Sequence, residues 1–130
     1  MTKVKKTEEQ WKQQLSENAY QVARKQGTEA AFSGAYYNNT EKGVYYCICC
    51  GEALFSSMEK YDSGSGWPSF WKSVAEPHIT EIRDSSHGMV RVEVCCTNCD
   101  AHLGHVFEDG PQPTGLRYCI NSVCLDFKKM

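Results

Sequence analysis

Eight of the 130 residues are cysteines, and four of them form two Cys-x-x-Cys turns. The first turn holds Cys47 and Cys50, and the second holds Cys96 and Cys99. A gap of two residues lets both thiolates of a turn converge on one ion, so the two turns together predict a tetrahedral zinc site. Because protein fills all four positions, this zinc would be structural, and we expect one Zn²⁺ per chain.

Closing such a site joins distant parts of the chain, because the 45 residues from 51 to 95 lie between Cys50 and Cys96. Loop closure over this length costs roughly 3 to 4 kcal/mol, whereas structural zinc in small peptides supplies on the order of 10 to 16 kcal/mol. Zinc binding therefore outweighs the entropy of closure. Two alternatives stay open. Cys49 and Cys95 could replace neighbouring ligands at a geometric cost, or the thiols could form disulfides or remain reduced in the core.

Composition narrows the class of protein. Fourteen Lys and Arg against sixteen Asp and Glu give a net charge of -2, so no basic excess favours nucleic acid or an anionic membrane as a partner. No apolar run approaches the roughly 20 residues of a membrane span, and the N-terminal sequence lacks the apolar core of a signal peptide. We therefore expect a cytoplasmic protein that forms a single domain over residues 1–130 and is monomeric by default.

Residues 1–30 are predicted to form a helical arm ahead of a β body at residues 31–130. Thr7, followed three residues later by a glutamine, fits a capping box for a first short helix. Ser16 can cap a second helix, whose apolar stripe precedes a stop at Gly27.

The body alternates short β-branched and aromatic runs with turn formers, which is typical of antiparallel strands. Gly43–Cys47 is a predicted strand that enters the first cysteine turn. The alternation in residues 89–94 (MVRVEV) predicts another strand, with valines on one face and charged residues on the other. Segments 61–70 and 108–115 are rich in turn formers and are predicted loops. The expected fold class is therefore mainly β.

Cys119 is the candidate nucleophile. Four cysteines remain once the metal ligands are set aside, namely Cys49, Cys95, Cys119 and Cys124. Only Cys119 stands among polar groups, because a strand would place Arg117, Cys119 and Asn121 on one face. A guanidinium beside Cys119 favours its nucleophilic thiolate, and the Asn121 amide can orient a polar substrate atom. The alternative is a cysteine that only packs within a strand.

Two further groups are candidates for chemistry. His102 and His105 are able to exchange protons near neutral pH. His102 also has ligand-like spacing from Cys99, but four cysteines already complete a tetrahedron, so proton chemistry is favoured over metal ligation. Trp67 stands in a constrained Gly-Trp-Pro loop, where it either belongs to the core or lines a pocket for a small apolar group.

Four motifs, taken in order, resemble the methionine-R-sulfoxide reductase B family: CICCGEALF, YDSGSGWPSFW, HGMVRVEVCCTNCDAHLGHVFEDGPQPTG and RYCINS. The resemblance runs from about residue 27 to residue 127. It implies two antiparallel sheets with short N-terminal helices, a structural zinc held by four cysteines, and reduction of the R epimer of methionine sulfoxide. Oxidised proteins and peptides are the implied substrates, with free methionine sulfoxide as a further candidate.

The resemblance also implies roles for individual residues. Cys119 would be the nucleophile and Trp67 would hold the substrate methyl group. Other catalytic and substrate-binding positions would be His102, His105, Asn121, Arg117, Asp109 and Phe107. In the implied reaction the Cys119 thiolate attacks the sulfoxide sulfur, a protonated neighbour such as His105 protonates the oxygen, and Cys119 becomes a sulfenic acid. Thioredoxin or another thiol would then regenerate it.

Ser65 departs from the common family pattern, because many relatives carry a resolving cysteine there. A serine cannot form the disulfide, and it is either natural, as in relatives without that thiol, or an introduced substitution. The thiol that regenerates Cys119 therefore stays open between Cys49, Cys95, Cys124 and an external reductant. We expect weaker coupling to thioredoxin than a cysteine at this position would give.

The residues alone also permit two rival functions. A zinc-stabilised binding module would need no chemistry at Cys119, whose thiol would then have an ordinary pKa. A thiol hydrolase could use Cys119 with His105 and either Asn121 or Asp109 on an ester or amide.

Overall fold

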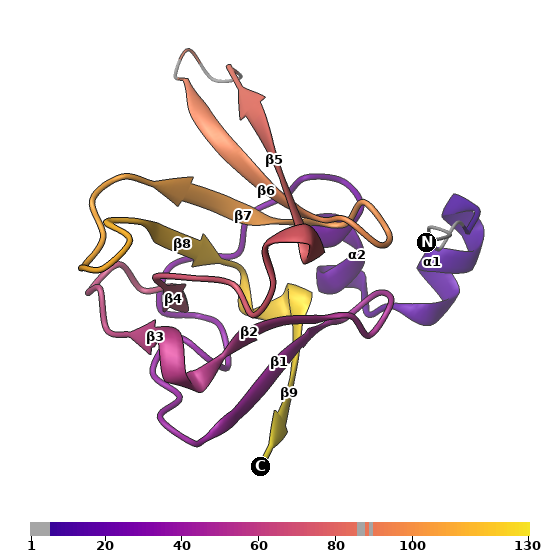
Figure 1. Cartoon of the computed structure of the whole chain (residues 1–130). Coiled ribbons are helices and arrows are strands. Elements are labelled where there is room, and N and C mark those ends of the chain that lie inside the picture. The colour runs from indigo at the N-terminus through magenta and orange to yellow at the C-terminus, as the bar shows by residue number, and fades with distance from the viewer. Residues whose placement is uncertain (1–5, 86–87, 89) are drawn as a thin grey trace.

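The computed structural model describes residues 6–85, 88 and 90–130, which form two antiparallel sheets and two short helices (Figure 1). One sheet has three strands in the order β2-β1-β9, and the other has six in the order β3-β4-β8-β7-β6-β5. This arrangement confirms the mainly β fold class. The helices and strands are α1 Glu8–Gln14, α2 Glu17–Ala23, β1 Gly43–Cys47, β2 Ala53–Ser56, β3 Lys60–Tyr61, β4 Ser69–Phe70, β5 Ile79–Asp84, β6 Arg91–Cys96, β7 His102–Phe107, β8 Arg117–Ile120 and β9 Leu125–Lys129.

Strand register explains how the six-stranded sheet separates a core face from a polar face. Val106 of β7 pairs with Val92 of β6 and with Tyr118 of β8, so these apolar side chains share one face. His105 pairs in the same way with Glu93 and Cys119, which places these three on the opposite face. The alternation in the sequence thus becomes a packed layer on one side and a layer of chemically active groups on the other.

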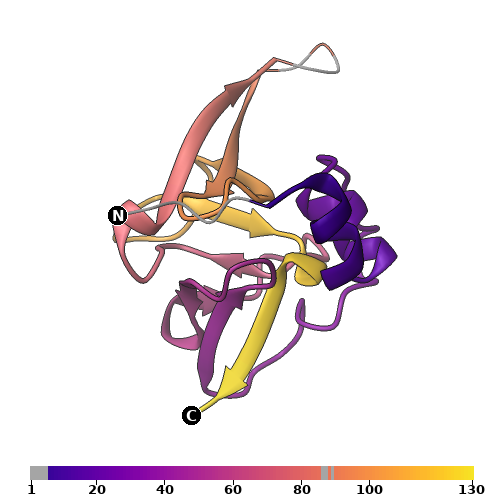
Figure 2. The same ribbon diagram turned by 90° about the vertical axis from the view of Figure 1, so that its right-hand side faces the viewer.

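Both predicted helix starts are present. The Thr7 hydroxyl accepts a hydrogen bond from the Gln10 backbone N–H, and the Gln10 side-chain oxygen accepts one from the Thr7 backbone N–H, which completes the capping box. Ser16 caps α2 through the backbone N–H of Ala19. Each helix has only seven residues, too few to be stable alone in water, so packing must hold them. Figure 2 shows both helices gathered on one side of the strands.

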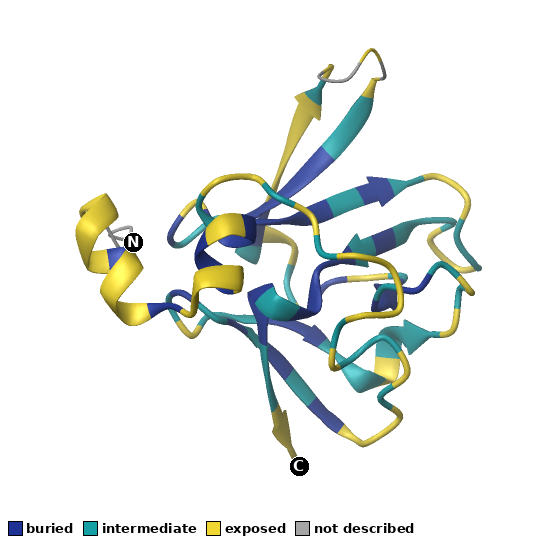
Figure 3. Ribbon diagram, turned by 180° about the vertical axis from the view of Figure 1, so that it is seen from behind, coloured by how far each residue is buried: buried dark blue, intermediate teal, exposed yellow. Residues whose placement is uncertain are grey.

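The buried residues lie on both the helices and the strands (Figure 3), and the arm and the body contribute to one hydrophobic cluster. Trp11 and Tyr20 of the helices are almost fully buried, as are Tyr45, Phe55 and Phe70 of the strands. Phe70 and Phe55 stack with ring centroids 4.5 Å apart, and Tyr45 meets Phe70 edge-on at 5.2 Å. The arm and the body therefore share one hydrophobic core, and their assignment to a single domain over residues 1–130 stays a prediction.

Some boundaries differ from those expected. The helix α2 ends at Ala23 rather than near Gly27, with Arg24 as its C-cap, and Gln26 then takes the left-handed backbone conformation with a φ of 58°. The strand predicted at residues 89–94 is β6, which begins at Arg91 and extends to Cys96, and Met89 lies outside the described residues. Among the described residues, no helix is long and apolar enough to cross a membrane.

Candidate active site and metal centre

The four predicted metal ligands lie together. The Sγ atoms of Cys47, Cys50, Cys96 and Cys99 all lie within 4.8 Å of one another, and this set could hold a metal ion. Cys47 ends β1 and Cys96 ends β6, while Cys50 and Cys99 stand in the turns that follow. The cluster therefore fastens the three-stranded sheet to the six-stranded sheet.

The spacing of the sulfurs fits a tetrahedral ion better than disulfides. The Sγ atoms are 3.6 Å apart for Cys47 and Cys99 and 3.6 Å apart for Cys50 and Cys96. A disulfide needs about 2.05 Å, whereas Zn–S bonds of about 2.3 Å in a tetrahedron separate sulfurs by about 3.8 Å. All eight cysteines are free. The alternative ligand Cys95 instead donates to the Glu93 carboxylate at 3.2 Å.

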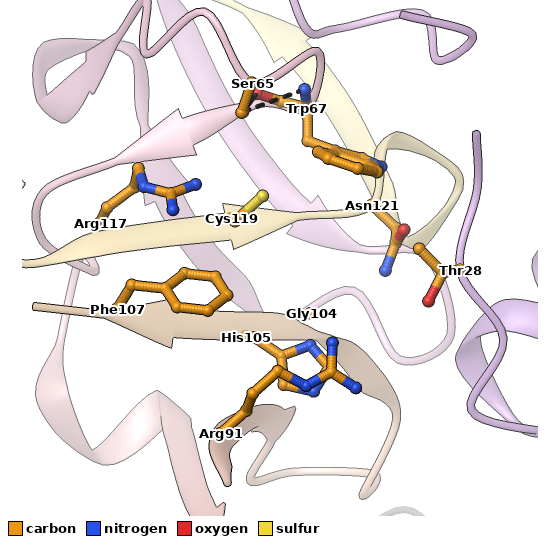
Figure 4. A pocket seen from close by; sticks show the side chains of 10 residues that line it. All are labelled: Thr28, Ser65, Trp67, Arg91, Gly104, His105, Phe107, Arg117, Cys119 and Asn121. Carbon is orange, nitrogen blue, oxygen red and sulfur yellow. Dashed lines mark hydrogen bonds between the residues drawn. The ribbon is translucent and has the colours of Figure 1, made fainter. Parts of the chain in front are cut away.

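A second site lies apart from these cysteines, in a pocket of about 380 Å³ over the polar face of the six-stranded sheet (Figure 4). Cys119 stands in it on β8, directly opposite His105 of β7 and Ser69 of β4. The pocket brings together most of the predicted site residues and adds three that the sequence did not single out. Its lining is Thr28, Ser65, Trp67, Arg91, Gly104, His105, Phe107, Arg117, Cys119 and Asn121.

Opposing effects act on the Cys119 thiol. Burial raises its pKa above the ordinary value, and the nearby Glu29 carboxylate acts in the same direction. The Arg117 guanidinium and a hydrogen bond from Ser65 both lower this pKa, but burial is the larger effect. The expected direction of the Arg117 effect is therefore right, while the net shift is upward. In the free protein at neutral pH, Cys119 is mainly a thiol.

Arg117 is itself held by two groups. Its Nε and Nη2 donate to the two carboxylate oxygens of Asp109 at 2.9 and 3.2 Å, and its guanidinium lies 4.6 Å from the centre of the Phe107 ring. The Asp109 pair raises the pKa of Arg117, and Arg117 lowers that of Asp109. Asp109 is exposed outside the pocket lining, so it acts on the site through Arg117.

The two histidines occupy different places. His105 lines the pocket, and its Nε2 lies 3.0 Å from an oxygen of Asp84, which also meets Arg91 at 3.5 Å. Burial lowers the pKa of His105 despite this carboxylate. His102 is only 4% exposed and lies outside the pocket lining, with its Nδ1 2.7 Å from the Glu93 carboxylate.

The arm fixes two of the pocket residues. Trp67 is half-buried and lines the pocket, and its Nε1 donates to the backbone carbonyl of Glu29 at 3.0 Å. The Glu29 N–H donates to the Asn121 side-chain oxygen at 3.0 Å, and the Asn121 amide donates to the Leu103 carbonyl at 3.0 Å. The oxygen and the nitrogen of the Asn121 side chain therefore both form hydrogen bonds to the backbone and hold it in position. These tertiary contacts carry no local sequence signal.

Ser65, which lines the pocket together with Cys119, belongs to a network of serine hydroxyls. Ser65 receives a hydrogen bond from Ser63 at 2.8 Å, and Ser63 also lies 2.7 Å from the fully buried Ser69. Ser65 thus has its oxygen directed by a hydrogen-bond network, and it lines the same pocket as Cys119. Figure 4 shows the two side chains on facing parts of the pocket.

Together, the fold and these two sites define a class: a mainly β protein with a tetracysteine centre and a separate pocket built around one cysteine. The family model described as SelR domain matches residues 15–129, and the chain belongs to this family. It is 60% identical over 127 residues to the peptide methionine sulfoxide reductase MsrB of Hahella chejuensis, and the alignment covers 98% of this chain and 91% of the relative. The chain is 60% identical to the MsrB of Pseudomonas fluorescens, in an alignment that covers 97% of this chain and 97% of the relative. It is 59% identical to the MsrB of Acinetobacter baylyi, in an alignment that covers 98% of this chain and 92% of the relative.

Proposed function

We propose that the protein is a peptide-methionine (R)-S-oxide reductase, which converts methionine-R-sulfoxide in oxidised proteins and peptides to methionine. The observation that carries this proposal is the placement of Cys119 in a pocket with Trp67, His105 and Arg117. The relatives named as peptide methionine sulfoxide reductases support the same reaction. An apolar indole wall suits the substrate methyl group, and thioether–aromatic contacts are worth about 0.3 to 1.5 kcal/mol.

The reaction balances as an oxygen transfer. The Cys119 sulfur attacks the sulfoxide sulfur and forms an S–S bond, and the substrate oxygen takes up a proton. The protonated oxygen then transfers to the Cys119 sulfur as the S–S bond and the substrate S–O bond break, which leaves Cys119 as a sulfenic acid and releases methionine. Methionine leaves with its sulfur reduced by two electrons, and the Cys119 sulfur is oxidised by two. The thiol proton is conserved in the sulfenic acid, so the first half-reaction needs no other reductant.

His105 is the proton carrier that we assign to this step. It stands across from Cys119 in the sheet, and its pKa is lowered by burial, so at neutral pH the ring is largely neutral. A neutral imidazole can accept the Cys119 proton and pass it to the sulfoxide oxygen, directly or through a water. This replaces the imidazolium expected from the sequence as the resting acid. Arg117 stabilises the thiolate that forms transiently.

Regeneration is proposed to use thiols from outside the pocket. Cys124 is fully buried and donates its thiol to the His102 carbonyl at 3.2 Å, and Cys95 is directed at Glu93. Because both are held by other groups, thioredoxin or a small thiol is the better reductant for the sulfenic acid. A reducing cytoplasm supplies such thiols and keeps cysteines free, and we propose a cytoplasmic monomer.

Zinc is the metal proposed for the tetracysteine cluster. Four thiolates are a donor set that zinc accepts in structural sites, and the sulfur spacings match it. Cys47, Cys50, Cys96 and Cys99 would hold it, one ion per chain. When bound it would supply stability rather than chemistry, since protein atoms would complete its coordination.

The test uses racemic methionine sulfoxide in a short peptide, with dithiothreitol as reductant and chiral separation of the remaining substrate. We expect loss of the R epimer alone, and no loss with a Cys119→Ala variant. Consumption of both epimers, or equal turnover by the variant, would contradict the proposal. Cleavage of a peptide or ester without sulfoxide reduction would favour the thiol hydrolase instead.

A further inference from the structure

A second cavity adjoins the catalytic pocket and shares Trp67 with it. This flanking cleft has a volume of about 530 Å³ and is lined chiefly by Phe32, segment 37–40, segment 60–62, Gly66 and Trp67. Its volume lies within the range of ligand-binding cavities. Because Trp67 lines both cavities, the flanking cleft lies next to the pocket that holds Cys119.

Phe32 is the unusual residue of the cleft. Its side chain is 60% exposed, and its backbone has a φ of 64°, a conformation that bulky residues rarely adopt. The Phe32 N–H donates to the Gly66 carbonyl at 2.7 Å, and its ring meets Tyr37 edge-on at 5.3 Å. Strained backbone of this kind persists where surrounding contacts enforce it, often at ligand-binding positions.

Gly66 makes this placement of the ring possible. A Cβ at residue 66 would lie 2.7 Å from the Phe32 ring, and the φ of Gly66 is 90°. The loop that carries Trp67 is therefore shaped to receive the Phe32 ring against its backbone. An aromatic side chain is held at the surface, beside the catalytic pocket, at a cost in backbone strain.

Two polar side chains that line the cleft, Lys60 and Asn39, form hydrogen bonds to other parts of the protein. The Lys60 ammonium donates to the Tyr37 carbonyl at 3.2 Å, and burial lowers its pKa. Asn39 donates to the Tyr45 hydroxyl at 2.9 Å and accepts from the Glu41 N–H at 3.2 Å. With the Lys60 and Asn39 side chains bound to other parts of the protein, Phe32, Tyr37 and Trp67 supply the apolar surface of the cleft, beside the polar side chains of Asn38, Thr40, Ser57 and Asp62.

We propose that the flanking cleft binds an apolar or aromatic residue next to the oxidised methionine of a polypeptide substrate, with Phe32 as its main contact. This inference rests on the proposed reductase function and specifies the sequence context that the same site prefers. A partly buried aromatic contact predicts a preference of about five- to tenfold in kcat/KM over a peptide with glycine at the flanking positions.

The experiment compares two peptides containing methionine-R-sulfoxide, one with phenylalanine at both flanking positions and one with glycine there. The ratio of their kcat/KM values is measured for the unaltered protein and for the variants Phe32→Ala, Phe32→Gly and Phe32→Tyr. We expect the ratio to fall to about one in the first two and to persist in the third. Phe32→Gly removes the ring while accommodating the positive φ, so it separates loss of contact from loss of folding.

Ile82→Ala is the matched control, because it removes another exposed apolar side chain from β5 without touching the flanking cleft. Its ratio should equal that of the unaltered protein. An unchanged ratio in Phe32→Ala and Phe32→Gly, or no preference in the unaltered protein, would overturn the inference. Failure of the unaltered protein to reduce either peptide would instead overturn the proposed function.

Discussion

At the level of single residues, the reactivity of Cys119 depends on a balance between burial and one cation. Burial raises the pKa of the thiol, and the Arg117 guanidinium opposes the rise. Asp109 holds Arg117 through two hydrogen bonds, so part of the positive charge is neutralised. The sequence revealed the Cys119–Arg117 pair by strand alternation. It could not reveal the net shift, because burial depends on the whole fold.

This balance predicts opposite effects of two substitutions on alkylation of Cys119. Arg117→Met removes the charge that lowers the thiol pKa, so the thiolate fraction falls and iodoacetamide reacts more slowly at mildly alkaline pH. Asp109→Asn leaves the guanidinium uncompensated and should speed the reaction. Rates followed by mass spectrometry as pH rises should give a higher apparent pKa for Arg117→Met and a lower one for Asp109→Asn. Faster alkylation of Arg117→Met than of Asp109→Asn would contradict this account.

Ser65 gives a second prediction at this scale. Ser65 and Cys119 line the same pocket, and a Ser65 hydrogen bond acts on the thiol. Ser65→Cys should therefore form a disulfide with oxidised Cys119 and increase thioredoxin-dependent turnover at least about fivefold. Ser65→Ala is the control that removes the hydroxyl without adding a thiol. Equal thioredoxin-dependent rates in the original protein and Ser65→Cys would refute the prediction.

Some of the predicted site residues line the pocket and others do not, and the sequence around each residue explains part of this difference. Trp67, His105 and Cys119 stand in local motifs, and all three line the pocket. Asn121 also lines it, although β8 has already ended at Ile120. His102 stands outside the lining, with its ring packed against that of His105 at 5.6 Å and its Nδ1 2.7 Å from the Glu93 carboxylate. No sequence pattern marked Thr28, and the alternation in residues 89–94 placed Arg91 on a charged face without linking it to Cys119.

At the level of elements, the pairing of β7 with β8 positions the reacting groups. Gly104 and Ile120 pair in this ladder, and His105 and Cys119 pair next to them. An ideal Cβ on Gly104 would lie 2.0 Å from the Cys119 carbonyl oxygen. The absence of a side chain therefore permits the close approach of the two strands at the nucleophile.

Gly104→Ala should separate these strands and displace Cys119. We expect a loss of about 1 to 3 kcal/mol in the free energy of unfolding, measured by urea denaturation. Turnover should fall further than the unfolded fraction explains, because the distance between Cys119 and His105 changes. A variant with full stability and full turnover would show that the ladder tolerates the methyl group and that its spacing does not set the rate.

Local signals identified single elements better than their partners. The strand β1 has the predicted bounds, and both helix caps are formed as expected. The order of the six-stranded sheet was beyond sequence reasoning, since β8 pairs not only with its predecessor β7 but also with β4, which lies in a distant part of the chain. Such pairings depend on tertiary packing and leave no period in the sequence.

At the level of the whole molecule, the tetracysteine cluster joins the two sheets. Cys47 ends β1 and Cys50 follows it, while Cys96 ends β6 and Cys99 lies between β6 and β7. The sequence predicted this set correctly, because Cys-x-x-Cys spacing is itself the geometric requirement. The neighbouring thiol of Cys49 is buried and does not belong to the group of four sulfurs that could hold an ion among the described residues.

Removing the metal should therefore destabilise the protein as a whole. Treatment with a strong zinc chelator is expected to lower the midpoint of thermal unfolding by more than about 10 °C. Elemental analysis of the untreated protein should find one zinc per chain, and Cys96→Ser should lose it. Retention of the same midpoint after complete removal of the ion would contradict a structural role.

The most direct test of the central claim is a single turnover without any added reductant. The reduced protein is mixed with an excess of peptide methionine-R-sulfoxide, and methionine formation and the oxidation state of each cysteine are measured together. The account predicts one methionine per chain in an initial burst and a sulfenic acid on Cys119, trapped with dimedone. A full burst from Cys119→Ala, or oxidation confined to other cysteines, would contradict it.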